Sequence, residues 1–116
     1  MIELLLPYPP TMNHYWRRGR HGTFISADGR NFRRSVGIIA AADRVPMLTG
    51  PLAVFIRMTP PDRRRRDIDN ILKPLLDALQ HAGCYEDDNQ IEQLTIRRRP
   101  PINGGNVLVT ITEAQP

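Results

Sequence analysis

The chain has 116 residues, a formal net charge of +4 and a pI near 10.0. This length suffices for one hydrophobic core, so we expect a single domain over residues 1–116, small enough that dimerisation would help to bury surface. The net positive charge favours an anionic partner, and nucleic acid is a better candidate than an anionic membrane surface.

Nothing in the sequence indicates export or membrane insertion. Its apolar runs fall short of the roughly 20 residues of a membrane span. The N-terminal residues 1–6 lack the basic start of a signal peptide. The only cysteine, Cys84, can form neither an intrachain disulfide nor a multi-thiol zinc site. We therefore expect a protein of the cytoplasm.

The first part of the chain predicts one strand and one exposed segment. An apolar run over residues 2–6 has strong β potential and is closed by the prolines of 7–10. Residues 11–22 are polar, basic and aromatic with little apolar periodicity, which predicts an arm or loop.

A strand, a helix and a second strand follow. Residues 23–25 predict a brief strand, and Ser26 is a suitable N-cap for a helix over about 27–44. Apolar residues recur there at helical spacing until Pro46 stops the pattern. A β-rich run over 52–58, bounded by Gly and Pro, predicts a buried strand.

A second helix is predicted by an apolar face between Ile68 and Leu79, with Gly83 as its C-terminal stop. An N-cap at Asp69 or Asn70 would place Pro74 about one turn in, where it must tighten or kink the helix start. Two closing strands follow over 93–99 and 106–112. The fold class is therefore α+β, a mixed sheet packed by two main helices.

Two carboxylates in D-x-D spacing follow an arginine run. In extended backbone, Asp67 and Asp69 would project to the same side, roughly 6.7 Å apart, and both could reach one hard cation. A third ligand must come from the acidic turn 86–88, from Glu92 or from a partner subunit. In the structural alternative, Asp69 caps the helix, Asp67 pairs with an arginine and the turn is solvated.

The neighbouring residues favour metal chemistry on phosphate. Oxygen-only ligands indicate Mg²⁺, with Mn²⁺ as a substitute, and such ions promote phosphodiester hydrolysis. Lys73, the only lysine, would stabilise the phosphoryl transition state or orient water. Its structural alternative is an i,i+4 pair with Asp69.

Arginine clusters at 17, 18 and 20, at 63–66 and at 97–99 fit a path along phosphate backbones. Each cluster taken singly is more typical of a solvated face. Tyr15 and Trp16 fit two interpretations equally well, stacking on an unpaired base or packing as a local plug. Non-catalytic DNA binding and metal-dependent phosphoryl transfer on other branched DNA remain open alternatives.

Several segments of the chain together match a known family pattern. They run from Pro7-Tyr8-Pro9-Pro10-Thr11-Met12-Asn13 through Ser26-Ala27-Asp28-Gly29 to Thr110-Ile111-Thr112-Glu113. The most specific parts are Pro61 to Asn70, then Lys73, Asp77-Ala78-Leu79, Ala82-Gly83 and Asp87-Asp88-Asn89-Gln90. In these segments the sequence resembles the RusA family of Holliday junction resolvases over nearly its whole length. Pro74, directly after Lys73, and Cys84-Tyr85 depart from the family pattern.

The resemblance implies a homodimeric, Mg²⁺-dependent endodeoxyribonuclease of bacterial or phage-associated origin. Such an enzyme resolves four-way junctions in recombination and repair by paired, symmetric nicks. The implied metal ligands are Asp67, Asp69 and Asp88, with Lys73 as catalytic base or charge stabiliser. The implied DNA contacts are Thr11, Met12, Asn13, His14, Arg63, Arg64, Arg65, Arg66 and Asn70.

Overall fold

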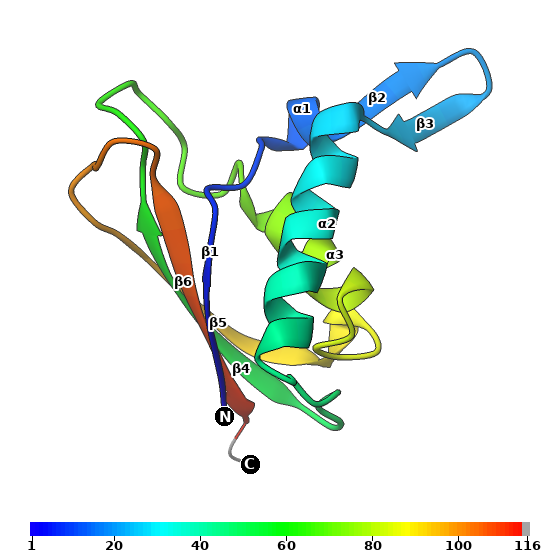
Figure 1. Ribbon diagram of the computed structural model, residues 1–116, viewed down its shortest axis with the longest axis vertical. Coiled ribbons are helices and arrows are strands. Elements are labelled where there is room, and N and C mark those ends of the chain that lie inside the picture. Colours follow the sequence, from blue (N-terminus) through cyan, green and yellow to red (C-terminus); the bar gives the residue numbers. More distant parts are fainter. Residues whose placement is uncertain (115–116) are drawn as a thin grey trace.

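The computed structural model describes residues 1–114 as a mixed sheet with helices on one face (Figure 1). The strand order is β1-β6-β4-β5, and β6 runs antiparallel to β1 and β4 while β5 is parallel to β4. The predicted α+β class and both closing strands are confirmed. The sheet comprises β1 (Ile2–Leu6), β4 (Leu52–Thr59), β5 (Ile91–Arg98) and β6 (Asn106–Glu113).

Alternation along the strands places the core between sheet and helices. In β4 every second residue from Leu52 to Met58 is buried, and the residues between them are only half-buried. Because successive side chains of a strand point to opposite sides, the buried and the half-buried residues of β4 lie on opposite faces of the sheet. Of the described helices, none is long and apolar enough to cross a membrane. The helices of the described residues are α1 (Met12–Tyr15), α2 (Ala27–Ala42), α3 (Leu72–His81) and the 3₁₀ helix η1 (Asp88–Gln90).

The helix α2 begins where the sequence predicts. Ser26 is its N-cap, and the side-chain oxygen accepts a hydrogen bond of 2.9 Å from the Gly29 amide. Its buried face carries Phe32, Val36 and Ala40, one residue per turn. The helix ends at Ala42, slightly before the expected residue 44.

Pro74 sets where α3 begins. The expected N-cap at Asp69 or Asn70 is wrong, since Ile71 occupies that position and makes no side-chain cap. A helix capped at Asn70 needs residue 74 to donate an amide hydrogen to the Asn70 carbonyl, and proline has none. The first such bond runs instead from the Leu75 amide to the Ile71 carbonyl, at 3.0 Å.

The segment predicted as an exposed arm or loop contains a short helix and half of a hairpin. Residues 11–22 include α1 and β2 (Trp16–Gly19), and β2 pairs with β3 (Gly22–Ile25) in a protruding hairpin (Figure 1). The brief strand expected at 23–25 and the exposed arm are thereby confirmed, but the sequence did not predict the helix at 12–15. The reason is tertiary, because Tyr15 is fully buried and its contacts hold a helix too short to persist alone.

The C-terminal end of α3 turns the chain back along the helix. Gly83 has φ 86°, its amide bonds the Gln80 carbonyl at 3.0 Å, and the Cys84 amide bonds the Leu79 carbonyl at 3.1 Å. These two bonds form a Schellman motif, which confirms Gly83 as the helix stop. The acidic turn that follows leads into η1.

Gly83→Ala is expected to lower the free energy of unfolding by about 1–2 kcal/mol, because a Cβ is unfavourable at positive φ. Gly37→Ala is the matched control. Gly37 lies within α2, where an added Cβ meets nothing within 4 Å, so this change should stabilise by about 0.5–1 kcal/mol. Urea unfolding measures the change in the free energy of unfolding for both variants. A change of the same sign in both would contradict the assignment of Gly83 as the helix stop.

Stability should also fall at alkaline pH through Cys84. Burial raises the pKa of its thiol from 9.0 to about 11. The folded chain keeps a proton that the unfolded chain loses near pH 9, so this contribution is complete below pH 9 and is lost as pH rises toward 11. Between pH 8 and pH 10 we expect the free energy of unfolding to fall by about 1 kcal/mol. Urea unfolding at both pH values measures this loss in wild type and in Cys84→Ala. An equal loss of unfolding free energy in the two proteins would contradict the role of Cys84.

Candidate active site

One backbone hydrogen bond joins two predicted DNA-contacting segments. The Met12 amide donates to the Asn70 carbonyl at 2.9 Å, which sets α1 beside the turn that precedes α3. The side chains of Met12, Asn13 and His14 are exposed there, and the Thr11 hydroxyl lies 3.0 Å from Nδ1 of His14. The structure therefore brings together residues that the sequence separates by more than fifty positions.

A polar network that sequence reasoning missed fixes α1 against both long helices. The Tyr15 hydroxyl donates to Oδ2 of Asp77 at 2.5 Å, and Nη2 of Arg33 donates to the same oxygen at 2.8 Å. Burial, and next the bond to Asp77, raise the pKa of Tyr15 above its ordinary value. Arg33 and Asp77 sit on different helices, so helical spacing gave no signal of their pairing. The signal that the sequence did contain was the place of Asp77 in the Asp77-Ala78-Leu79 segment of the family resemblance.

Lys73 meets the acidic turn that the chain brings back along α3. Its Nζ lies 3.7 Å from Oδ2 of Asp88. The lysine side chain is 63% exposed and that of Asp88 is 29% exposed, so the contact is an open one that a ligand can reach. Among residues 1–114, the ion pair that Lys73 makes is with Asp88 and not with Asp69.

The two neighbouring aspartates of the acidic turn have different surroundings. Asp87 is the N-cap of η1, and its Oδ1 accepts from the Asn89 amide at 2.9 Å. Gln90 completes a capping box by accepting from the Asp87 amide at 3.0 Å. Asp87 is therefore engaged in local structure, and Asp88 is the carboxylate that faces Lys73.

Asp67 and Asp69 lie at the N-terminal approach to α3. The expected extended conformation is wrong, because the Asn70 amide bonds the Asp67 carbonyl at 3.3 Å and the Leu72 amide bonds that of Asp69 at 3.1 Å. These bonds make turns of the segment. Both aspartates are exposed.

The carboxylates do not form a closed metal cage. Within residues 1–114, no three His, Cys, Asp or Glu side chains converge closely enough to hold an ion. The donor set still fits Mg²⁺, which usually keeps several waters and needs only one or two protein carboxylates together with phosphate oxygens. Exposed aspartates beside a cationic surface match that pattern of binding.

The arginine run divides into one firmly tied side chain and three exposed ones, of which Arg64 makes only a loose ion pair, with Nε 3.9 Å from Oδ2 of Asp62. Nη1 of Arg66 bonds Oδ1 of Asp62 at 2.7 Å, and this contact lowers the pKa of Asp62 to about 2. Arg98 donates to the Arg66 carbonyl at 2.6 Å, which fastens the loop to β5. The side chains of Arg63, Arg64 and Arg65 remain exposed.

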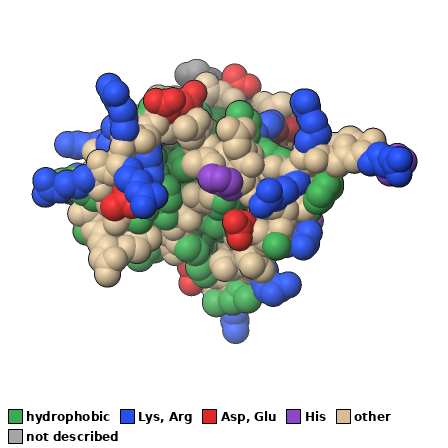
Figure 2. Space-filling view, turned by 90° about the horizontal axis from the view of Figure 1, so that it is seen from above, with side chains coloured by type: hydrophobic (Ala, Val, Ile, Leu, Met, Phe, Trp, Pro, Cys, Tyr) green, Lys and Arg blue, Asp and Glu red, His purple; other side chains and the backbone are tan. Residues whose placement is uncertain are grey.

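Cationic side chains flank this end of the molecule. Figure 2 shows Lys and Arg side chains on both sides of the face and an acidic side chain near its middle. Such a surface attracts a polyanion while keeping carboxylates available for a divalent ion.

Comparison with known proteins identifies the family of this chain. The family described as Endodeoxyribonuclease RusA matches residues 7–112. The crossover junction endodeoxyribonuclease rusA of Enterobacteria phage HK97 is 40% identical over 114 residues, covering 97% of this chain and 95% of the relative. The proteins of that name from Enterobacteria phage 82 and Escherichia coli K12 are 40% and 39% identical over 112 residues, each covering 96% of this chain and 93% of the relative. The resemblance seen in the sequence is confirmed, and the chain belongs to the RusA family of endodeoxyribonucleases.

Proposed function

We propose that this protein is a divalent-metal-dependent, structure-selective endodeoxyribonuclease that resolves Holliday junctions by paired symmetric nicks. The observation that carries the proposal is the contact between Lys73 and Asp88, together with Arg17 and Arg18, which line the same pocket as Lys73. The names of the phage and bacterial relatives, crossover junction endodeoxyribonucleases, support the same activity. DNA as substrate and relatives from phages and bacteria also lead us to propose action in the bacterial cytoplasm.

Asp67, Asp69 and Asp88 are the proposed ligands of Mg²⁺, with Mn²⁺ as a substitute. When bound, such an ion activates water and offsets negative charge at the scissile phosphate. Lys73 has two states in this proposal. It pairs with Asp88 before DNA arrives, and its ammonium then stabilises charge on the phosphoryl oxygens or orients the attacking water.

The DNA contacts divide between two segments. Thr11, Met12, Asn13 and His14 approach the substrate from α1, and Asn70 lies against them through its carbonyl. Arg63, Arg64 and Arg65 supply exposed cations for phosphate oxygens. Arg66 contributes mainly by closing the loop on Asp62, so its own phosphate contact requires that pair to open.

We further propose that the active form is a homodimer. A chain of 116 residues is small enough that dimerisation would help to bury surface. A twofold dimer also presents two equivalent sites to a junction whose strands are related by a twofold axis.

A matched pair of variants tests the metal assignment. Asp88→Asn should reduce junction cleavage at least 100-fold in Mg²⁺ and leave junction binding in EDTA unchanged, and Asp69→Asn should do the same. Asp87→Ser, which keeps an N-cap oxygen, should cleave like wild type, because Asp87 serves η1. The measurement is strand-resolved cleavage of a labelled four-way junction beside linear duplex of identical sequence.

Three results would contradict the proposal. Full cleavage by Asp88→Asn and Asp69→Asn would remove these residues from the metal site. Tight junction binding by wild type with no nicks in Mg²⁺ or Mn²⁺ would instead indicate a non-catalytic DNA-binding module. Nicks spread equally over other branched DNA would indicate a less selective nuclease.

Salt dependence tests the arginine surface separately from the chemistry. Replacing Arg63, Arg64 and Arg65 by Gln should lower the slope of log affinity against log salt concentration by about 0.9 for each lost phosphate contact. Arg44→Gln, an exposed change beyond the far end of α2, is the control and should leave the slope unchanged. An unaltered slope in the triple variant would exclude these arginines from the DNA interface.

A further inference from the structure

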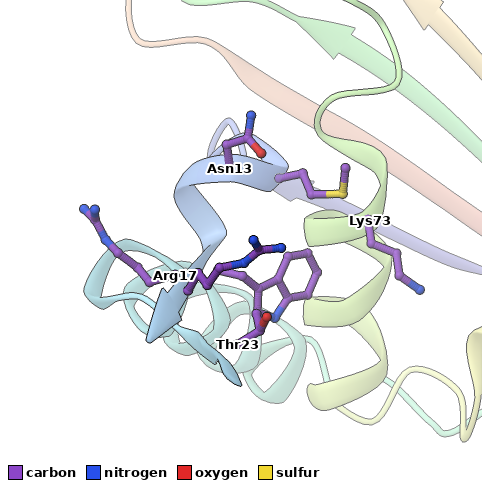
Figure 3. Close-up of a pocket in the computed structure, with 7 residues that line it drawn as sticks. Asn13, Arg17, Thr23 and Lys73 are labelled. Carbon is purple, nitrogen blue, oxygen red and sulfur yellow. The ribbon is translucent and has the colours of Figure 1, made fainter. Parts of the chain in front are cut away.

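A cavity of about 670 Å³ opens between the hairpin and α3. Figure 3 shows its two sides, with α1 and the β2–β3 hairpin on one and the first turn of α3, bearing Lys73, on the other. Its lining includes Met12, Asn13 and Trp16 as well as Arg17 and Arg18. Trp16, which lines this cavity, has no role in the function proposed above.

The two adjacent aromatic residues beside the cavity, Tyr15 and Trp16, have different surroundings. Tyr15 is fully buried and belongs to the network with Arg33 and Asp77. Trp16 is only half-buried, and its ring meets that of Tyr15 edge-on, with centroids 4.5 Å apart and planes at 78°. Of the two interpretations left open for this pair, packing therefore applies to Tyr15. Trp16 is held rigidly on it and still lines the cavity.

The chemistry of the lining selects a class of ligand. An indole ring offers a flat apolar surface, and stacking on such a surface is tolerant of base identity. The Asn13 amide both donates and accepts hydrogen bonds, as the edge of a base does. Arg17, Arg18 and Lys73 add cations for phosphate at the rim. Aromatic surface, amide and cations together match a single nucleotide.

We propose that this cavity binds one unpaired DNA nucleotide next to the phosphate that is cut, with its base stacked on Trp16. The inference rests on the proposed function and extends it. Lys73 lines the cavity and also contacts Asp88, so a nucleotide held there lies directly beside the proposed reacting groups. Nucleotides inside a duplex have both faces covered by their neighbours, whereas a branch point exposes a base at small cost. The pocket thus links cleavage to branched DNA.

Base fluorescence at the branch point tests this proposal directly. A junction carries 2-aminopurine at one of the nucleotides flanking the branch, one position at a time, and wild-type protein is added to saturation in EDTA. We expect the emission to change severalfold at one position and to stay constant in linear duplex. Trp16→Ala should abolish the change and weaken junction binding about 5- to 150-fold, the range expected for one lost stacking contact.

Two further variants separate stacking from damage to the fold. Trp16→Phe keeps an aromatic ring and should restore most of the emission change. Phe24→Ala is the matched control, because Phe24 is 53% exposed on the same hairpin and does not line the cavity. It should behave like wild type in both measurements. The emission change with wild-type protein is measured without any substitution. It therefore tests the pocket even if the Trp16→Ala variant does not fold.

The outcomes distinguish this inference from the proposed function. Saturable junction binding with constant emission at every flanking position would overturn the pocket, as would an emission change that Trp16→Ala retains at saturation. Either result would leave junction cleavage intact. Absence of junction binding by wild type would overturn the proposed function and this inference with it.

Discussion

The geometry of the candidate site depends on the carbonyl oxygen of Asn70. Pro74 has no amide hydrogen to donate to it, so this oxygen stays outside the hydrogen-bond ladder of α3. It accepts instead from the Met12 amide at 2.9 Å. The proline that delays the start of the helix thus leaves open the acceptor to which α1 is attached. Because the bond is between backbone atoms, the side chains of Met12 and Asn70 remain exposed.

The short helix α1 needs a second attachment, since four residues cannot sustain a helix in water. Ser26 provides one, because its hydroxyl contacts the carbonyls of His14 and Tyr15 at 2.5 and 3.0 Å while its oxygen caps α2. Asp77 provides the other by accepting from both Tyr15 and Arg33. These contacts join α1, α2 and α3 around Tyr15. They give the exposed residues of α1 and the hairpin a rigid base beside Lys73.

Local sequence patterns made the sheet and the α2 helix predictable. The β-rich run bounded by Gly and Pro predicted β4, the Ser26 cap predicted the start of α2, and both are confirmed. The helix at 12–15 was not predicted, because its order comes from partners such as Asp77, far away in sequence. The predicted start of α3 fails for a local reason that the sequence did contain. Pro74 forbids a cap at Asn70, but apolar periodicity back to Ile68 outweighed it, and Ile68 proves to be 39% exposed.

The acidic residues show where residue spacing stops being informative. Asp87 and Asp88 are equivalent in a sequence, yet an N-cap bond occupies the first and leaves the second facing Lys73. D-x-D spacing suggested one shared cation through extended backbone, whereas turns at both aspartates make their relative placement a property of the loop. Carboxylates that stay exposed and do not converge destabilise the free protein little, because only a small part of their charge is removed from water. In the proposed function, a site built from such carboxylates would reach full strength only when phosphate oxygens join it, which would couple ion binding to the arrival of DNA.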